Sequence, residues 1–308
     1  MQYIGLQTQI WRNNIKSTLL LLAFPSLILG LTWIFWLLNS RSYNFEETNS
    51  NFLLSFPWVT GGVLLWFLIA YFSHTSMIAS ATGAKPLSRK ENKKIYNLVE
   101  NLCISQGMKT PKINIIEDTS LNAFASGINE NTYTISLSEG IINKLNDDEL
   151  KAVIAHEITH IQNKDVRLLI ISIIFVGIFS FITEMAFRSL RVSNQKEDNK
   201  KSNFVILILL LAIVGYFLSL VFRFALSRKR EFLADAGSAQ ITRNPKSLSS
   251  ALEKISKDAR IESVTRKDVA QLFIENPQEK SKGIALFVNN LFATHPPIEE
   301  RINALKGF

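Results

Sequence analysis

The sequence predicts a helix-rich α+β protein in which a polar core with a small antiparallel sheet is fused to two to four transmembrane helices. Two observations lead to this fold class. Stretches of about 20 residues carry almost no charge, and the polar residues between them follow helical and then strand periodicity. The chain has 308 residues, one cysteine and a formal net charge of +8. One cysteine excludes an intrachain disulfide and a cysteine-based zinc finger, and a basic excess beside apolar stretches suits a membrane surface.

Four apolar stretches are long enough to cross a hydrocarbon core about 30 Å thick, which takes about 20 helical residues. They cover residues 17–38, 52–72, 168–187 and 204–222. The first is too long for the apolar region of a signal peptide, so we expect a retained anchor. Only Glu184, in the third stretch, is charged. It is either a functional intramembrane carboxylate or a residue near the interface or facing a helix partner.

The positions of lysine and arginine predict the orientation. More of them lie near span ends on the side of the N-terminus than on the other side, which places that side in the cytoplasm. The loop between the third and fourth stretches is also basic, so these two either cross fully or form a shallow hairpin or a packed helical pair. The expected parts are a membrane hairpin (1–72), a first soluble part (73–167), two further hydrophobic helices (168–222) and a second soluble part (223–308).

The soluble parts show clear periodicity. Apolar spacing predicts helices over residues 90–105, 138–144, 146–163 and 244–257, and β-branched alternation predicts strands over 112–117, 121–126 and 132–137. Strands joined by such short turns are most simply antiparallel. Asn146 can cap the third of these helices, with Glu149 placed three residues later as in a capping box. A polar loop over 276–283 is either solvated or a mobile segment over a cleft.

The helix over 146–163 contains the sequence His156-Glu157-Ile158-Thr159-His160. Residues four apart lie on one face of a helix, so the two imidazoles can reach one tetrahedral ion. Glu157 lies beside that row, where a carboxylate can take a proton from a metal-bound water. The alternative is two histidines on a polar helix surface, for which the capped and amphipathic context gives little support.

A catalytic zinc needs a third protein ligand and an open position. The best candidate is Glu231, which shares a helix face with Asp235 four residues later. Glu231 can complete a sphere of two histidines and one glutamate, and Asp235 can accept a hydrogen bond from a ligand histidine. From the residues alone, Glu231 is equally well a partner of the adjacent basic run over residues 228–230.

Four blocks of the sequence together resemble a known family. They are Asn122–Gly127, His156–His160 with Asn163–Asp165, Glu231–Asp235, and Thr294–Arg301. The chain resembles the HtpX proteases, which are integral-membrane zinc metallopeptidases related to the CAAX prenyl proteases. The resemblance covers nearly the whole chain, including the order of spans and soluble parts. It implies a zincin-type core, in which a small antiparallel sheet accompanies the helix with the His-Glu-x-x-His motif.

The resemblance also implies roles for single residues. His156, His160 and Glu231 would bind one zinc ion, Glu157 would act as general base and then acid, and Asp235 would orient a ligand. Asn122, Ala123, Phe124 and Ala125 would form the edge strand that receives the substrate backbone, and His295 would steady the oxyanion. Two alternatives remain, because Asn122 and Phe124 also suit a plain strand and His295 also suits a helix start.

The expected function is a zinc endopeptidase of a bacterial-type cytoplasmic membrane. It would hydrolyse membrane proteins or unfolded polypeptides at the cytoplasmic face, in protein quality control, with the lipid bilayer as its other partner. Alternatives are a processing peptidase for one peptide or lipidated substrate, a silent membrane scaffold, and a permeation protein that uses Glu184. The sequence has no glycine-rich phosphate loop and no nucleic-acid motif, so we expect neither a nucleotide nor a nucleic acid as a partner. The oligomeric state stays open.

Overall fold

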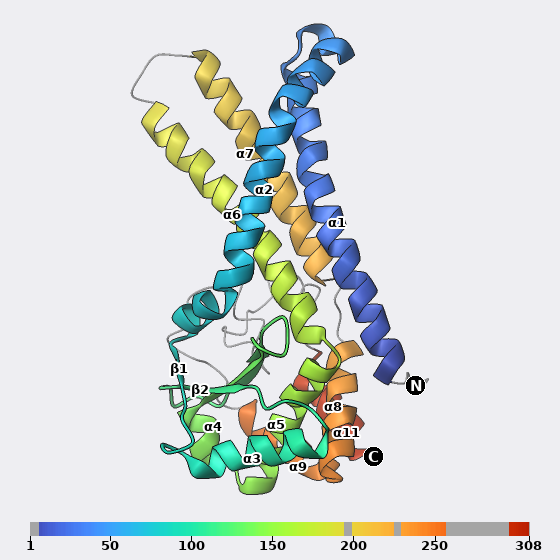
Figure 1. The fold of residues 1–308 in the computed structure, drawn as a ribbon, viewed down its shortest axis with the longest axis vertical. Coiled ribbons are helices and arrows are strands. Elements are labelled where there is room, and N and C mark those ends of the chain that lie inside the picture. Colours follow the sequence, from blue (N-terminus) through green and yellow to red (C-terminus); the bar gives the residue numbers. More distant parts are fainter. Residues whose placement is uncertain (1–5, 194–198, 225–228, 257–295, 308) are drawn as a thin grey trace. The chain divides into compact units, whose positions relative to one another are not determined.

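The computed structural model describes residues 6–193, 199–224, 229–256 and 296–307 (Figure 1). The chain divides into two compact units. Unit 1 consists of Met1–Asn14, His74–Ile170 and Phe224–Phe308, and unit 2 consists of Ile15–Ser73 and Ile171–Arg223. Each unit is therefore built from segments that lie far apart in the sequence.

Unit 2 contains most of four long helices. These are α1 (Leu6–Asn39), α2 (Phe45–Thr82), α6 (Asp165–Ser193) and α7 (Asn199–Phe224), with the short 3-10 helix η1 (Arg41–Tyr43) between the first two. Within the described ranges, three helical segments are long and apolar enough to cross a membrane, namely Ile10–Asn39, Phe45–Thr82 and Asp165–Arg188. In α7 a shorter apolar helix covers Val205–Leu218. Three candidate spans fall within the predicted range of two to four.

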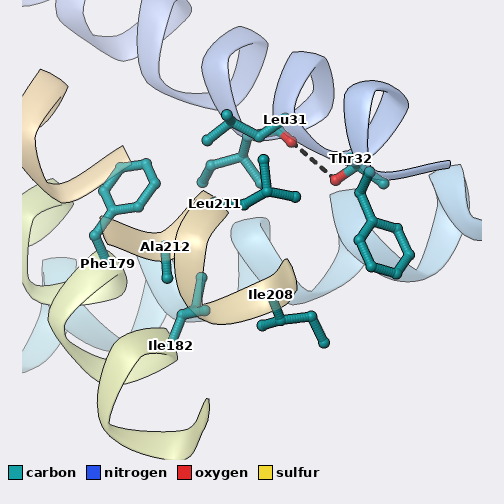
Figure 2. Close-up of a pocket in the computed structure, with 9 residues that line it drawn as sticks. Leu31, Thr32, Phe179, Ile182, Ile208, Leu211 and Ala212 are labelled. Atoms are coloured by element: carbon teal, nitrogen blue, oxygen red, sulfur yellow. Dashed lines mark hydrogen bonds between the residues drawn. The ribbon is translucent and has the colours of Figure 1, made fainter. Parts of the chain in front are cut away.

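Aromatic and aliphatic side chains pack unit 2. Phe24 of α1 stacks on Phe175 of α6 with ring centroids 4.1 Å apart. Figure 2 shows an apolar pocket of about 230 Å³ lined by residues of α1, α6 and α7. Thr32 in this lining donates its hydroxyl to the carbonyl of Ile28 at 2.8 Å, so the hydroxyl is satisfied within its own helix.

The charged residue of the third apolar stretch is paired inside its own helix. Glu184 forms an ion pair with Arg188, four residues later in α6, and both side chains are exposed. Its carboxylate is thus balanced by a neighbouring guanidinium.

Unit 1 contains a small mixed sheet with the strand order β1-β2-β4-β3. The strands are β1 (Ala84–Pro86), β2 (Lys112–Ile116), β3 (Ala123–Ser126) and β4 (Thr134–Ser138). The prediction of an antiparallel sheet is wrong for β2 and β4, which run parallel. After β2 the chain crosses to the edge of the sheet, forms β3, and returns antiparallel as β4 between them. Because β2 and β3 are not neighbours, their short connection does not make a hairpin.

Six further helices of unit 1 accompany this sheet in the described part of the chain. They are α3 (Lys93–Ser105), α4 (Glu139–Lys144), α5 (Asp147–Gln162), α8 (Lys229–Thr242), α9 (Pro245–Ile255) and α11 (Ile298–Lys306). Helix α5 contacts β3, α3, α8 and α9, and α11 contacts α8 and α9 (Figure 1). The helix with the His-Glu-x-x-His motif therefore lies at the centre of the unit, between the edge strand and the C-terminal helices.

Candidate metal centre

Helix α5 begins where the sequence predicts. The Asn146 side chain accepts from the Glu149 amide and the Glu149 side chain accepts from the Asn146 amide, each at 2.9 Å, which makes a capping box. Asp147 and Asp148 in the first turn complement the helix dipole. This start fixes the register of the helix, and with it the face on which His156 and His160 lie.

Glu149 also ties α5 to α9. Its carboxylate accepts from Lys254 Nζ and from Ser250 Oγ, each at 2.7 Å, and the residue is buried. Burial alone would raise the pKa of Glu149, but the hydrogen bonds from Lys254, Ser250 and Asn146 outweigh it and lower this pKa.

We expect Glu149→Gln to lower the free energy of unfolding by about 1.5–3 kcal/mol at pH 7, the range for a hydrogen bond to a charged group. A lowered pKa in the folded state means that the carboxylate stabilises the fold fully above its ordinary value of 4.5 and loses this effect as pH falls through the folded-state value. The two proteins should therefore approach each other in stability at low pH. Denaturant unfolding at pH 7 and at acid pH checks this, and a constant difference would contradict it.

The three predicted ligand residues converge. One ligand atom from each of His156, His160 and Glu231 lies within 4.8 Å of the others. The two histidine Nε2 atoms are 3.1 Å apart, and the Glu231 carboxylate oxygens lie 3.7 Å from His156 Nε2 and 3.6 Å from His160 Nε2. Two imidazoles and a carboxylate that lie this close together match the three protein donors of a catalytic zinc site.

A close approach between α5 and α8 makes this convergence possible. A Cβ atom added to Gly237 of α8 would lie 2.4 Å from Thr159 Cγ2 of α5. The next residue, Ser238, donates its hydroxyl to the Ala152 carbonyl of α5 at 2.6 Å. The absence of a side chain at position 237 thus lets the helix with Glu231 pack directly against the helix with the two histidines.

Each histidine contacts a carboxylate through its other ring nitrogen. Asp235 Oδ1 lies 3.0 Å from His156 Nδ1, as the sequence predicts for an orienting residue. Asp165 Oδ2 lies 3.1 Å from His160 Nδ1, a contact that the sequence reasoning did not anticipate. Such carboxylates fix the tautomer and ring orientation of metal-binding histidines.

Three carboxylates act on His160. Burial alone would lower the pKa of His160, but the carboxylates of Glu231, Asp165 and Glu157 outweigh it and raise this pKa to about 9. The folded protein therefore favours a positive charge at this position. A divalent cation between the three predicted ligands would meet the same electrostatic requirement.

Arg301 of α11 ends the fourth block of the resemblance, and it is the second residue to which the sequence reasoning gave no role. It is 1% exposed, and it donates to both oxygens of Asp235, at 2.9 Å from Nε and 2.7 Å from Nη2. Its Nη1 lies 3.5 Å from Glu231 Oε2, and its Nη2 lies 3.4 Å from His156 Nε2. Burial alone would raise the pKa of Asp235, but this guanidinium outweighs it and lowers that pKa.

Glu157 lies next to the predicted ligands and against the edge strand. It is 2% exposed, and this burial raises its pKa although His156, His160 and a hydrogen bond from the Ala125 backbone act in the opposite direction. The carboxylate is therefore easier to protonate than a solvated one, which suits a group that must take up and release a proton.

The predicted substrate strand is β3, with Asn122 just before it, at the edge of the sheet. The Asn122 carbonyl accepts from the Ser138 amide at 3.0 Å, so Asn122 faces β4. By alternation, the peptide groups of Ala123 and Ala125 point away from β4. The Ala123 amide contacts Asn122 Oδ1 at 3.0 Å and the Ala125 backbone bonds to Glu157. Residues Ala123 to Ser126 are all buried.

Two features predicted from the sequence, His295 and the polar loop over 276–283, lie outside the residues that the structure describes.

Known proteins resemble this chain in sequence and in fold. A family model described as "Peptidase family M48" matches residues 89–308. A protein named "Protease HtpX homolog" from Bacteroides fragilis is 58% identical, covering 100% of both chains. Another of that name from Dictyoglomus turgidum is 40% identical, covering 80% of this chain and 81% of its own. The crystal structure of S. mikatae Ste24p matches with a TM-score of 0.50 and 19% identity, over 96% of this chain and 66% of that one, which is a likeness of fold.

Proposed function

The chain belongs to peptidase family M48 and is a membrane metalloprotease, and from this premise we propose that it is a zinc endopeptidase acting on membrane proteins or unfolded polypeptides at the cytoplasmic face. The observation that carries the proposal is the convergence of one ligand atom each from His156, His160 and Glu231 within 4.8 Å. Two imidazole nitrogens and a carboxylate oxygen suit zinc better than Mg²⁺ or Ca²⁺, which prefer oxygen ligands alone.

Zinc at this site would polarise a peptide carbonyl and acidify a water molecule. The protein's own residues supply the proton transfers and the orientation. Glu157 accepts a proton from the attacking water and then donates it to the leaving amine nitrogen, for which its raised pKa is suited. Asp235 and Asp165 each contact the Nδ1 atom of one imidazole, which favours a proton on Nδ1 and leaves Nε2 free to face the site.

The edge strand supports recognition of an extended peptide. The carbonyls of Ala123 and Ala125 point away from β4 and can accept hydrogen bonds from a peptide added as a further strand. Binding through backbone groups tolerates many side-chain sequences, which supports a role in degrading damaged or misassembled membrane proteins.

We expect Glu231→Ala to weaken zinc binding by more than about 100-fold. Loss of a residue that only contacts a metal ligand already costs about 10- to 100-fold in affinity. The variant loses one of three predicted ligands, so proteolysis of a membrane-protein substrate should fall with it. The measurement is metal content by equilibrium dialysis, alongside cleavage with and without a chelator. The matched control is Glu253→Gln, an exposed carboxylate paired with Lys306. Stoichiometric zinc in Glu231→Ala would remove this residue from the ligand set.

A further inference from the structure

Asn13 is a buried polar residue at the beginning of the first membrane helix. It is 0% exposed and lies in α1 just before the first apolar stretch. Residues 1–14 belong to unit 1, with the candidate metal centre, whereas α1 from Ile15 onward belongs to unit 2. A buried amide costs free energy unless it is hydrogen-bonded, so its partners indicate why an asparagine is there.

The side-chain amide nitrogen of Asn13, Nδ2, has two hydrogen-bond acceptors, and both come from the segment that joins α5 to α6. Nδ2 donates to the Asn163 carbonyl and to Asp165 Oδ1, each at 2.7 Å. A backbone carbonyl and a carboxylate only accept hydrogen bonds, so this position requires a donor. An aspartate of the same shape would place acceptor against acceptor.

These two bonds span a strained turn. Lys164, between the two partners, has a φ of +59°, which a residue with a side chain rarely adopts. Asn13 holds the residues on both sides of this turn. This turn also positions Asp165. The carboxylate oxygen of Asp165 that does not contact Asn13, Oδ2, lies 3.1 Å from His160 Nδ1.

We propose that Asn13 is a positioning residue of the metal centre, which fixes Asp165 and through it the imidazole of His160. The inference rests on the proposed function, in which His160 binds zinc. It makes the N-terminal end of α1 a part of the active site, because Asn13 Nδ2 lies 2.7 Å from Asp165 Oδ1 and Asp165 Oδ2 lies 3.1 Å from Nδ1 of His160, a predicted zinc ligand.

The test compares two isosteric charge substitutions in α1 of the full chain in detergent. Asn13→Asp should weaken zinc binding by about 10- to 100-fold, as loss of an outer-shell partner does. Asn39→Asp, at the exposed end of the same helix, should stay within about twofold, as surface substitutions do. Zinc affinity is measured by competition with a chromophoric chelator, and the thermal unfolding of the zinc-free proteins is measured beside it.

A swap of the two groups separates positioning from a merely structural role. In Asn13→Asp with Asp165→Asn, the amide introduced at position 165 can donate to the new carboxylate while its oxygen still accepts from His160. This double variant should bind zinc more tightly than Asn13→Asp alone. Asn13→Ala removes both bonds without adding charge, and should weaken zinc binding severalfold even if Asn13→Asp does not fold.

Unchanged zinc affinity in Asn13→Asp or in Asn13→Ala would overturn the proposal, even with a lowered unfolding temperature, because the residue would then serve the fold alone. A double variant no better than Asn13→Asp would also overturn it. A wild-type chain that binds no zinc would instead overturn the proposed function, so the two failures are distinguishable.

Discussion

Replacing Glu157 with glutamine is expected to lower kcat for peptide hydrolysis by about 100- to 10,000-fold, the contribution typical of general acid–base catalysis. Glutamine keeps the shape of the side chain but cannot take up the proton of the attacking water. Glu157 is not one of the three predicted ligands, so zinc should stay bound. The measurement is cleavage of a membrane-protein substrate at saturation, together with the metal content of the purified variant.

The matched control for this prediction is Glu139→Gln, an exposed carboxylate in the first turn of α4. It should keep wild-type turnover. Turnover at the wild-type rate in Glu157→Gln would remove the residue from the proton transfers. Loss of zinc in the same variant would instead assign Glu157 to the ligand set.

Arg301→Met is expected to cost the metal-free protein about 3–5 kcal/mol of unfolding free energy, as breaking a buried ion pair by removing one partner does. Methionine fills much of the same volume but leaves Asp235 without the guanidinium that now binds both of its oxygens. Glu231 loses a neighbouring positive charge as well. Thermal or denaturant unfolding in the presence of a chelator measures the effect.

Two further variants show whether the cost comes from the buried charge. Lys306→Met, on the same helix, removes an exposed pair with Glu253 and should cost no more than about 1 kcal/mol. Arg301→Met combined with Asp235→Leu removes both charges and should be more stable than Arg301→Met alone, although it should lose activity because His156 loses its orienting carboxylate. An Arg301→Met protein as stable as Lys306→Met would contradict the account of Arg301.

The parts of the site that depend on local sequence were predictable. The capping box of Asn146 and Glu149 and the spacing of His156 and His160 involve residues within a few positions of one another, so a single helix fixes them. Glu231 was ambiguous because its sequence neighbours are basic, and the packing of α8 on α5 brings it beside the two histidines. The resemblance to the HtpX proteases implied a ligand role without supplying this geometry.

The parts that depend on distant contacts were not predictable. Arg301 is 66 positions from Asp235 and 145 from His156, and Asn13 is 150 or more positions from its two partners. The residues around Arg301 and Asn13 in the sequence do not show what these side chains contact. The parallel pairing of β2 and β4 was missed for the same reason, since short connections favoured hairpins whereas the strand order is set by packing across the sheet. Hydrophobic periodicity locates elements, and it does not report which element lies beside which.

The distribution of the site along the chain has a consequence for how the protein is made. Ribosomes release a polypeptide from its N-terminus onward, so the two histidines emerge before α6 and α7 are synthesised, whereas Glu231 and Arg301 follow them. A nascent copy therefore lacks one of the three predicted ligands until Glu231 has been made, after the residues of α6 and α7. Before that point it has no complete metal centre with which to cut neighbouring chains.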